Sequence, residues 1–454
     1  MKTRKNVLIC AILACATWGT TAMAATEQQK LDAIIDGLDN LVATQQAGGY
    51  WNYGGYEPAA TGAALQALMS RKDKYWSSGD AVAYQAAADK AVAYLLSIAT
   101  LTPVNTRNDG VNICPGGSGN CNGIFWNAAG NEDSYTTGLV ASGLDTYALV
   151  DHKSNMEATP IGPLAGLKWS EIAQGITNLW SASQSTANQG NRIGGWRYAL
   201  GSPSYDSDMS TTQWGIISLI YDQSLGATTP AIVKTDLAKW LAFAQDPVSG
   251  AGCYQGPTSG ICDHSDTGGL LLGLNLVGKP NTDTAVQNAL AFLNNNWQQT
   301  ANNTWYGNFG HPYAMWGVYK GLEVTIGLKN GQPGSLPAVI TNLRPGTCGA
   351  PNLPGIPPDA ANCNWWEDYN EWLVQNQNAD GSWAGYQYWD GPLATAFNVS
   401  IKGATKIPVP PQVPRSAAPA VSHLMLLVLG LSLSLAGALR IARHGTLTGR
   451  STRA

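Results

Sequence analysis

One pattern recurs along this 454-residue chain and restricts its possible folds more than any other feature. It is clearest from Gly194 to Tyr221, where a glycine-aromatic turn leads into a polar loop with Asp206 and Asp208. Apolar residues at helical spacing come before the turn, at 172–180, and after the loop, at 209–221. The unit is therefore a helix, an aromatic turn, an acidic loop and a second helix.

The rest of the chain repeats this unit. First helices are expected at 31–41, 86–98, 172–180, 232–244, 285–297 and 366–374, and second helices at 61–69, 135–149, 209–221, 267–277, 313–328 and 393–401. A period of roughly 50–75 residues is typical of a repeat array. The terminal units are as apolar as the middle ones, whereas an open solenoid needs polar capping repeats.

We therefore predict an all-α fold, an α/α toroid of about six helical hairpins, for residues 25–405. The second helices are rich in Gly, Ala and Thr, which lets helices approach closely, so they are expected to form the inner ring. The first helices carry most of the charge and are expected to form the outer ring.

The two ends indicate export. Lys2, Arg4 and Lys5, an apolar run and the small residues Ala22 and Ala24 predict a signal peptide at 1–24, with an uncleaved anchor as the alternative. A Pro-rich linker at 406–420 leads to an apolar segment at 421–439, long enough to span a membrane. The basic tail at 440–454 would stay on the cytoplasmic side. The protein is expected in the periplasm or at the cell surface.

Cysteine spacing agrees with export. Outside the signal peptide the cysteines form three close pairs: Cys114 with Cys121, Cys253 with Cys262, and Cys348 with Cys363. In an exported chain such pairs predict disulfides, each contributing roughly 2–3 kcal/mol. Metal binding by these thiols is the alternative, but no CxxC motif occurs.

Composition excludes some partners and suggests a kind of site. A net charge of −4 and 12% charged residues argue against nucleic acid as a partner. The chain has 17 Trp and 18 Tyr but only 5 Phe, so most of its aromatic side chains carry a polar group. Such side chains suit the wall of a wet cavity as well as a core.

Two motifs resemble a known family. Gln375–Trp383, which reads QNQNADGSW, resembles the QW motif of squalene-hopene cyclases, and Gly194–Tyr198, which reads GGWRY, resembles the prenyltransferase/squalene-oxidase repeat. The resemblance implies an α/α toroid, a fold shared by cyclases, protein prenyltransferase β-subunits and thioester domains, so it does not fix the activity. The C-terminal tail resembles bacterial surface-sorting signals handled by exosortase-type enzymes. Cleavage of the tail and plain membrane anchoring both stay open.

The resemblance also implies candidate catalytic residues. Asp206-Ser207-Asp208-Met209 falls on the Asp-x-Asp-Asp motif of class II cyclases, with Asp208 at the proton donor's position and Met209 in place of the third Asp. We predict Asp206 and Asp208 as catalytic candidates, without class II cyclase activity. The alternative is that Asp208 caps the inner helix while Asp206 holds the loop, through Arg197. Cys253 and His311 resemble zinc-ligand segments, but Ala251 replaces the required Asp, so no metal and no cofactor are predicted.

Polar residues stand before each expected inner helix, and in a toroid those positions meet at one mouth. The candidate ligand-binding residues are Glu57, Glu132, Asp133, Trp196, Arg197, Asp266, His311 and Asp390. Acids also favour helix N-termini for structural reasons, which is the alternative reading.

Three functions stay open, and the sequence does not decide whether the protein is an enzyme. The first is binding of an extended, isoprenoid-like ligand in an acidic, aromatic axial cavity. The second is a glycan-active hydrolase or lyase that uses paired carboxylates. The third is a non-catalytic surface scaffold. The oligomeric state is not predicted.

Overall fold

The computed structural model describes residues 25–117, 119–186, 192–200, 206–302, 305–327, 339–345 and 364–403. The predicted signal peptide, the Pro-rich linker, the apolar segment 421–439 and the basic tail lie outside these residues, as do Cys348 and Cys363. Among the described residues, no helix combines the length and the apolar character that crossing a bilayer requires.

The described chain is mostly helical, as predicted for an all-α fold. The helices at the positions expected for first helices are α1 (Glu27–Thr44), α4 (Ala81–Ser97), α6 (Trp169–Ser183), α8 (Ala231–Ala244), α10 (Thr284–Asn296) and α12 (Trp365–Gln375). Those at the positions of second helices are α2 (Glu57–Met69), α5 (Asp133–Val150), α7 (Met209–Ser224), α9 (His264–Leu276), α11 (Pro312–Thr325) and α13 (Gly391–Lys402). A short helix α3 (Lys72–Tyr75) and 3-10 turns at Pro115–Gly117, Ala129–Asn131 and Pro257–Ser259 complete the helical elements of the described part.

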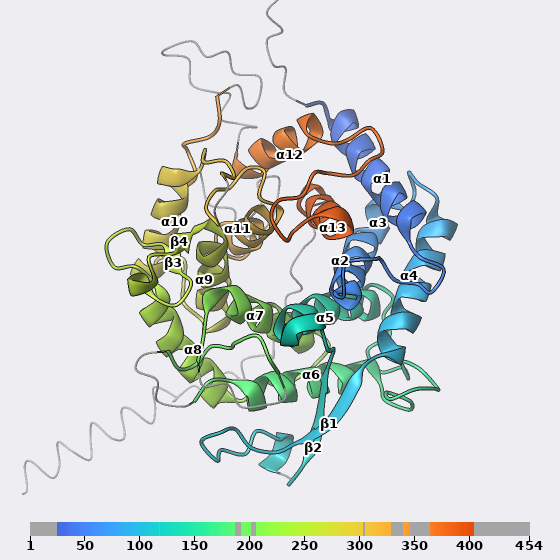
Figure 1. The fold of residues 1–454 in the computed structure, drawn as a ribbon, viewed down its shortest axis with the longest axis vertical. Helices are drawn as coiled ribbons and strands as arrows, with labels where there is room; N and C mark the ends of the chain where they lie inside the picture. Colours follow the sequence, from blue (N-terminus) through green and yellow to red (C-terminus); the bar gives the residue numbers. More distant parts are fainter. Residues whose placement is uncertain are drawn as a thin grey trace, which may run out of the picture. The chain divides into compact units, whose positions relative to one another are not determined.

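The second helices form a closed series of contacts (Figure 1). α2 contacts α5, α5 contacts α7, α7 contacts α9, α9 contacts α11, α11 contacts α13, and α13 returns to α2. These helices are buried on nearly all faces, because small residues let their backbones approach one another. Gly143, for example, leaves no room for a Cβ beside the carbonyl of Gly62, which would lie 2.3 Å away. The first helices bury mainly one face, and α1 touches both α4 and α12.

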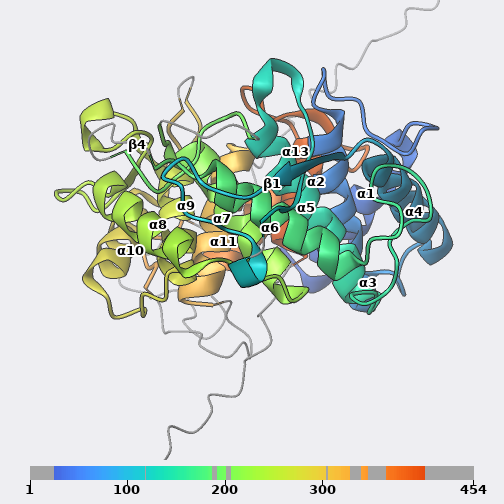
Figure 2. The same cartoon turned by 90° about the horizontal axis from the view of Figure 1, so that it is seen from below.

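Two short antiparallel hairpins were not predicted. β1 (Thr100–Val104) pairs with β2 (Cys121–Phe125), and β3 (Gly252–Cys253) pairs with β4 (Cys262–Asp263). The first hairpin lies across α6 (Figure 2), which explains why α6 is more buried than the other first helices. The hairpins carry the predicted disulfides Cys114–Cys121 and Cys253–Cys262, both of which are present.

A tryptophan repeatedly fastens the turn to the helix before it. In four units its indole Nε1 donates to a carbonyl in the last turn of the preceding helix, at 2.7–2.8 Å: Trp51 to Leu41, Trp126 to Leu95, Trp196 to Trp180, and Trp383 to Leu373. Carbonyls at a helix C-terminus have no partner within the helix. The motif's tryptophan therefore gives a buried carbonyl of the last helical turn a donor while filling the core.

A glutamine at the same turn joins one unit to the next. Its Nε2 donates to the carbonyl of the turn's glycine and to a carbonyl of the next first helix: Gln45 to Ala87, Gln184 to Val233, Gln245 to Ala285, and Gln377 to Ala33, at 2.8–2.9 Å. The last of these bonds runs from the last unit, between α12 and α13, to α1. The repeated motif thus links sequence neighbours and also links the last unit to the first.

The glycine of this turn is required by geometry, which gives a testable prediction. Gly381 has φ +83°, and a Cβ there would lie 2.1 Å from the carbonyl oxygen of Asp36 in α1. Gly110 has nearly the same φ, +81°, with open space around it. Gly110→Ala should cost about 1 kcal/mol for the left-handed backbone alone, and Gly381→Ala about 2 kcal/mol more for the overlap. Urea unfolding of both variants measures the difference; equal midpoints would contradict this packing between α1 and the last unit.

Candidate functional site

The N-terminal ends of α7, α9 and α11 carry the polar side chains of the site. The N-cap residues of these helices each accept a hydrogen bond from a backbone N–H of the first turn: Asp208 Oδ1 from Thr211 (2.7 Å), Asp263 Oδ1 from Asp266 (2.9 Å), and His311 Nδ1 from Ala314 (3.4 Å). The hydroxyl of Tyr313 donates to the carbonyl of Ser210 at 3.0 Å, which ties the start of α11 to the start of α7. The three caps therefore lie at the same end of neighbouring helices.

A cavity of about 210 Å³ opens at this end. Its wall is mostly aromatic, with side chains from α5, α11 and the loops before the second helices: Tyr135, Tyr198, Tyr254, Trp305, Tyr313 and Trp389. Trp389 and Tyr313 stack in parallel with ring centroids 4.1 Å apart, and Tyr135 stacks on Tyr198 at 5.9 Å. Stacking of this kind holds the large side chains in fixed orientations, so the wall is preorganised.

Two carboxyl groups face this aromatic wall. Asp263 and Asp266 both line the cavity, and Asp266 is only 2% exposed. Asp263 Oδ1 accepts from the hydroxyl of Ser265 at 2.8 Å and from the N–H of Asp266. Oδ1 of Asp266 has no hydrogen-bond partner among the described residues. A buried acceptor of this kind is costly unless a ligand, a water or a proton satisfies it.

Burial governs the protonation of these groups. It raises the pKa of Asp266 well above the ordinary value, and the nearby charges of Asp263 and Asp208 raise it further. Burial likewise raises the pKa of Asp263 to about 6. Burial, together with the neighbouring His264, lowers the pKa of His311 to about 4, so His311 is neutral at pH 7. Burial and the neighbouring carboxylates therefore favour the uncharged form of Asp266.

The predicted catalytic pair lies beside this cavity and does not line it. Asp208 is fully buried, and its oxygens accept from Ser210 Oγ (2.7 Å), Thr211 N, Thr211 Oγ1 (2.9 Å) and Arg197 Nη1 (2.5 Å). Asp206 accepts from Arg192 and from Gln255, each at 3.3 Å. Burial raises the pKa of Asp208, and the hydrogen bonds and the charge of Arg197 oppose that effect. The contacts are those of the alternative reading, in which Asp208 caps α7; the catalytic role stays a prediction.

Of the predicted ligand-binding residues, Asp266 and His311 line the cavity. Arg197 reaches its edge, where Nη1 donates to the hydroxyl of Tyr254 at 3.0 Å. The others make contacts elsewhere: Glu57 accepts from Gly55 N (3.1 Å), Asp133 accepts from Ala128 N (3.0 Å), and Glu132 is hydrogen-bonded to Tyr56. The backbone N–H of Asp390 donates to Tyr53 Oη (3.3 Å), and Trp196 is buried in the core. These residues do not belong to the lining of this cavity.

The sequence prediction missed several lining residues, including Tyr135, Ser210, Tyr313 and Trp389. Three lining residues share a position that the sequence could have revealed, two residues after the N-cap of an inner helix. Ser210 follows the cap Asp208, Ser265 follows Asp263, and Tyr313 follows His311. That position faces the cavity on each of these helices. The position two residues after the cap lines the cavity on all three helices, whereas of the three caps Asp208 does not.

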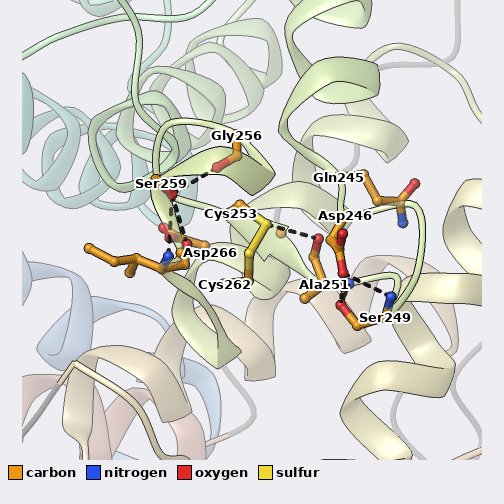
Figure 3. Close-up of a disulfide and its surroundings, with 12 residues drawn as sticks. Gln245, Asp246, Ser249, Ala251, Cys253, Gly256, Ser259, Cys262 and Asp266 are labelled. Atoms are coloured by element: carbon orange, nitrogen blue, oxygen red, sulfur yellow. Dashed lines mark hydrogen bonds between the residues drawn. A yellow bond between two sulfur atoms is a disulfide. The ribbon is translucent and has the colours of Figure 1, made fainter.

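The loop that brings Tyr254 to the cavity is closed by the Cys253–Cys262 disulfide (Figure 3). This bond joins β3 to β4, directly before Asp263 at the start of α9. The backbone of Gly252 packs so closely on the carbonyl of Asp266 that a Cβ would lie 2.3 Å from it. The disulfide and this contact fix the loop against the acidic end of the helix. Comparison with protein-family models and with curated proteins gives no match for this chain.

Proposed function

We propose that this chain is an exported α/α toroid of the prenyltransferase/squalene-cyclase repeat type, tethered through its C-terminal segment, and that it binds one end of an extended ligand in the aromatic, acidic cavity. The closed series of contacts among the second helices and the bond from Gln377 to Ala33 support the toroid of helical hairpins. The two disulfides support an oxidising compartment. The start of α7, α9 and α11 at the cavity supports an axial position.

The observation that carries this proposal is the cavity of about 210 Å³ with its six aromatic side chains. A cavity of about 150 Å³ is large enough for a benzene ring in a protein core. The cavity therefore accepts a ring-sized group, and the remainder of a longer ligand would extend beyond it. Its wall combines aromatic side chains with a small number of polar groups, a composition typical of ligand pockets.

Class II cyclase activity is not expected. The residue at the proton donor's position, Asp208, accepts four hydrogen bonds, one of them from its ion-pair partner Arg197, and it is not among the residues that line the cavity. A second candidate function is nevertheless favoured by one observation: Asp266 lines the cavity as a buried carboxyl group, and its Oδ1 has no hydrogen-bond partner among the described residues. Such a group can act as a general acid, as in glycan hydrolysis.

The test is a cavity-filling substitution. Ile261 lines the cavity, so Ile261→Trp should fill it, whereas Val248 is 93% exposed and Val248→Trp is a matched surface control. Titrations of the full chain with a C15 and a C20 isoprenoid alcohol and with a linear hexasaccharide can be followed by tryptophan fluorescence. We expect one ligand class to bind, with affinity at least tenfold lower in I261W and unchanged in V248W. No binding of either class, or equal effects of the two variants, would refute the proposal.

A further inference from the structure

Two exposed aromatic side chains meet at the rim of the cavity. Among the Trp and Tyr residues of the described chain, Trp305 and Tyr388 are the two that are exposed, at 46% and 73%. Their rings stack, with centroids 5.9 Å apart and an interplanar angle of 23°. Trp305 also lines the cavity, so the pair lies directly beside it. Stacking covers one face of each ring, and the exposed fractions show that both side chains keep surface that a ligand can contact.

The packing of the repeat does not require Trp305. In three other units a buried tryptophan stands two residues after a glycine with positive φ: Trp51 after Gly49, Trp196 after Gly194, and Trp383 after Gly381. In the fifth unit the same position, after Gly307 with φ +115°, is taken by the buried Phe309. Trp305 is therefore additional to the core of its unit.

A tight turn holds Tyr388 at the surface. Tyr386 and Trp389 exchange two backbone hydrogen bonds, each of 3.0 Å, and the ring of Tyr386 lies 4.8 Å from that of His311. Between them, Gln387 has φ +55°, a left-handed backbone that few residues other than glycine adopt. Strain of this kind is concentrated at ligand-binding and active sites. The turn fixes its two end residues against the cavity and leaves Tyr388 in contact with water.

The chemistry of the rim and the cavity together indicates the kind of ligand. The pair offers flat apolar rings at a wet surface, and the cavity beside it adds the polar side chains of Ser210, Asp263 and Ser265. No Lys or Arg is among the residues that line the cavity, which argues against an anionic ligand. A pyranose ring has a face of C–H groups that can stack on an aromatic ring and hydroxyl groups around its edge. A hydrocarbon chain laid over the same pair would leave much of its apolar surface in water.

We infer that Trp305 and Tyr388 form a binding platform for a neutral sugar ring, and that the extended ligand is a neutral saccharide with one unit in the cavity and the next over this pair. This inference rests on the proposed function and names the chemical class of its ligand. The turn at Gln387 and the stacking of the two rings hold the platform in place before a ligand arrives, which lowers the entropic cost of binding.

The test is calorimetric titration of the full chain with two neutral hexasaccharides, cellohexaose and maltohexaose. We expect at least one to bind, with affinity at least tenfold lower in Trp305→Ala and in Tyr388→Ala. Tyr388→Phe keeps the ring and should retain the affinity, whereas Tyr388→Leu keeps apolar bulk without a flat ring and should lose as much as Tyr388→Ala. Tyr50→Ala is the control, because Tyr50 is a partly exposed tyrosine that contacts the ring of Tyr94 at 5.1 Å and does not line the cavity.

Each outcome supports or overturns the inference. If neither hexasaccharide binds, the ligand class is wrong, whereas the proposed function is still decided by the binding of the isoprenoid alcohols to I261W and the wild type. If a hexasaccharide binds and Trp305→Ala and Tyr388→Ala leave its affinity unchanged, the platform is refuted even where I261W abolishes binding. Wild-type affinity in Tyr388→Leu would show that the contact does not depend on stacking. Because Tyr388 is exposed, its variants should unfold at the temperature of the wild type, which a thermal scan checks.

Discussion

Replacing Asp208 with alanine is expected to lower the free energy of unfolding by about 3–4 kcal/mol. The change removes the cap of α7, worth about 1 kcal/mol, and the charge-assisted bond to Arg197, worth about 1.5–3 kcal/mol. Because the Arg197 side chain is 31% exposed, water compensates part of the loss. The hydroxyls of Ser210 and Thr211 lose their acceptor in addition.

Two matched variants make this prediction specific. Asp208→Asn keeps an oxygen for the N–H of Thr211, so it should cost only about 1–2 kcal/mol. Asp206→Ala removes a carboxylate whose side chain is 24% exposed and whose ion pair with Arg192 is long, at 3.3 Å, so it should cost less than about 1 kcal/mol. Chemical denaturation of all three variants gives the order of their stabilities. Comparable stability of D208A and D206A would contradict the structural role of Asp208.

Much of the fold could be predicted because its signals are local. Helical periodicity located the helices, and the disulfides followed from the spacing of Cys114, Cys121, Cys253 and Cys262. The hairpin of β1 and β2 could not be predicted in the same way, because Pro103 within β1 argues against a strand. The pairing is decided instead by contact with α6 and by the disulfide that closes the loop.

The site was less predictable, because two acidic runs look alike in the sequence. Asp206-Ser207-Asp208 and Asp263-His264-Ser265-Asp266 both look, in the sequence, like acidic runs before an inner helix, although α9 begins at His264. They differ in what lies nearby in space: Asp208 meets Arg197, and Oδ1 of Asp266 meets no donor in the described structure. Partners of this kind come from the packing of three helices and their loops. Sequence spacing alone therefore could not separate the structural acid from the acid of the cavity.

A second acidic pair, far along the same inner helices, is expected to make stability depend strongly on pH. Asp145 of α5 and Asp222 of α7 are both fully buried, and their carboxyl groups are hydrogen-bonded to each other. Oδ2 of Asp145 and Oδ1 of Asp222 have no other partner in the described ranges. A proton held between the two groups satisfies both oxygens. Burial raises the pKa of Asp145 to about 7, and burial and the charge of Asp145 raise that of Asp222 further.

Whether stability rises or falls with pH follows from the number of protons that the folded and unfolded states bind. In the unfolded chain both groups titrate near pH 3.9, so above that pH the folded state binds more protons. The contribution of the pair to stability is therefore complete below about pH 4 and is lost as the pH rises through about 7. For Asp145 alone the loss is at most about 4 kcal/mol, since one pKa unit corresponds to 1.36 kcal/mol.

Asp145→Asn should reveal this contribution, because asparagine keeps the shape of the protonated acid and cannot ionise. Relative to the wild type, the variant should become steadily more stable between pH 5 and pH 8, by about 2–4 kcal/mol. Asp246→Asn is the control: hydrogen bonds from Ser249 lower the pKa of Asp246, so that group stays ionised over the same range. Unfolding by urea at several pH values measures both. If the difference between D145N and wild type stays constant with pH, the two carboxyl groups do not share a proton.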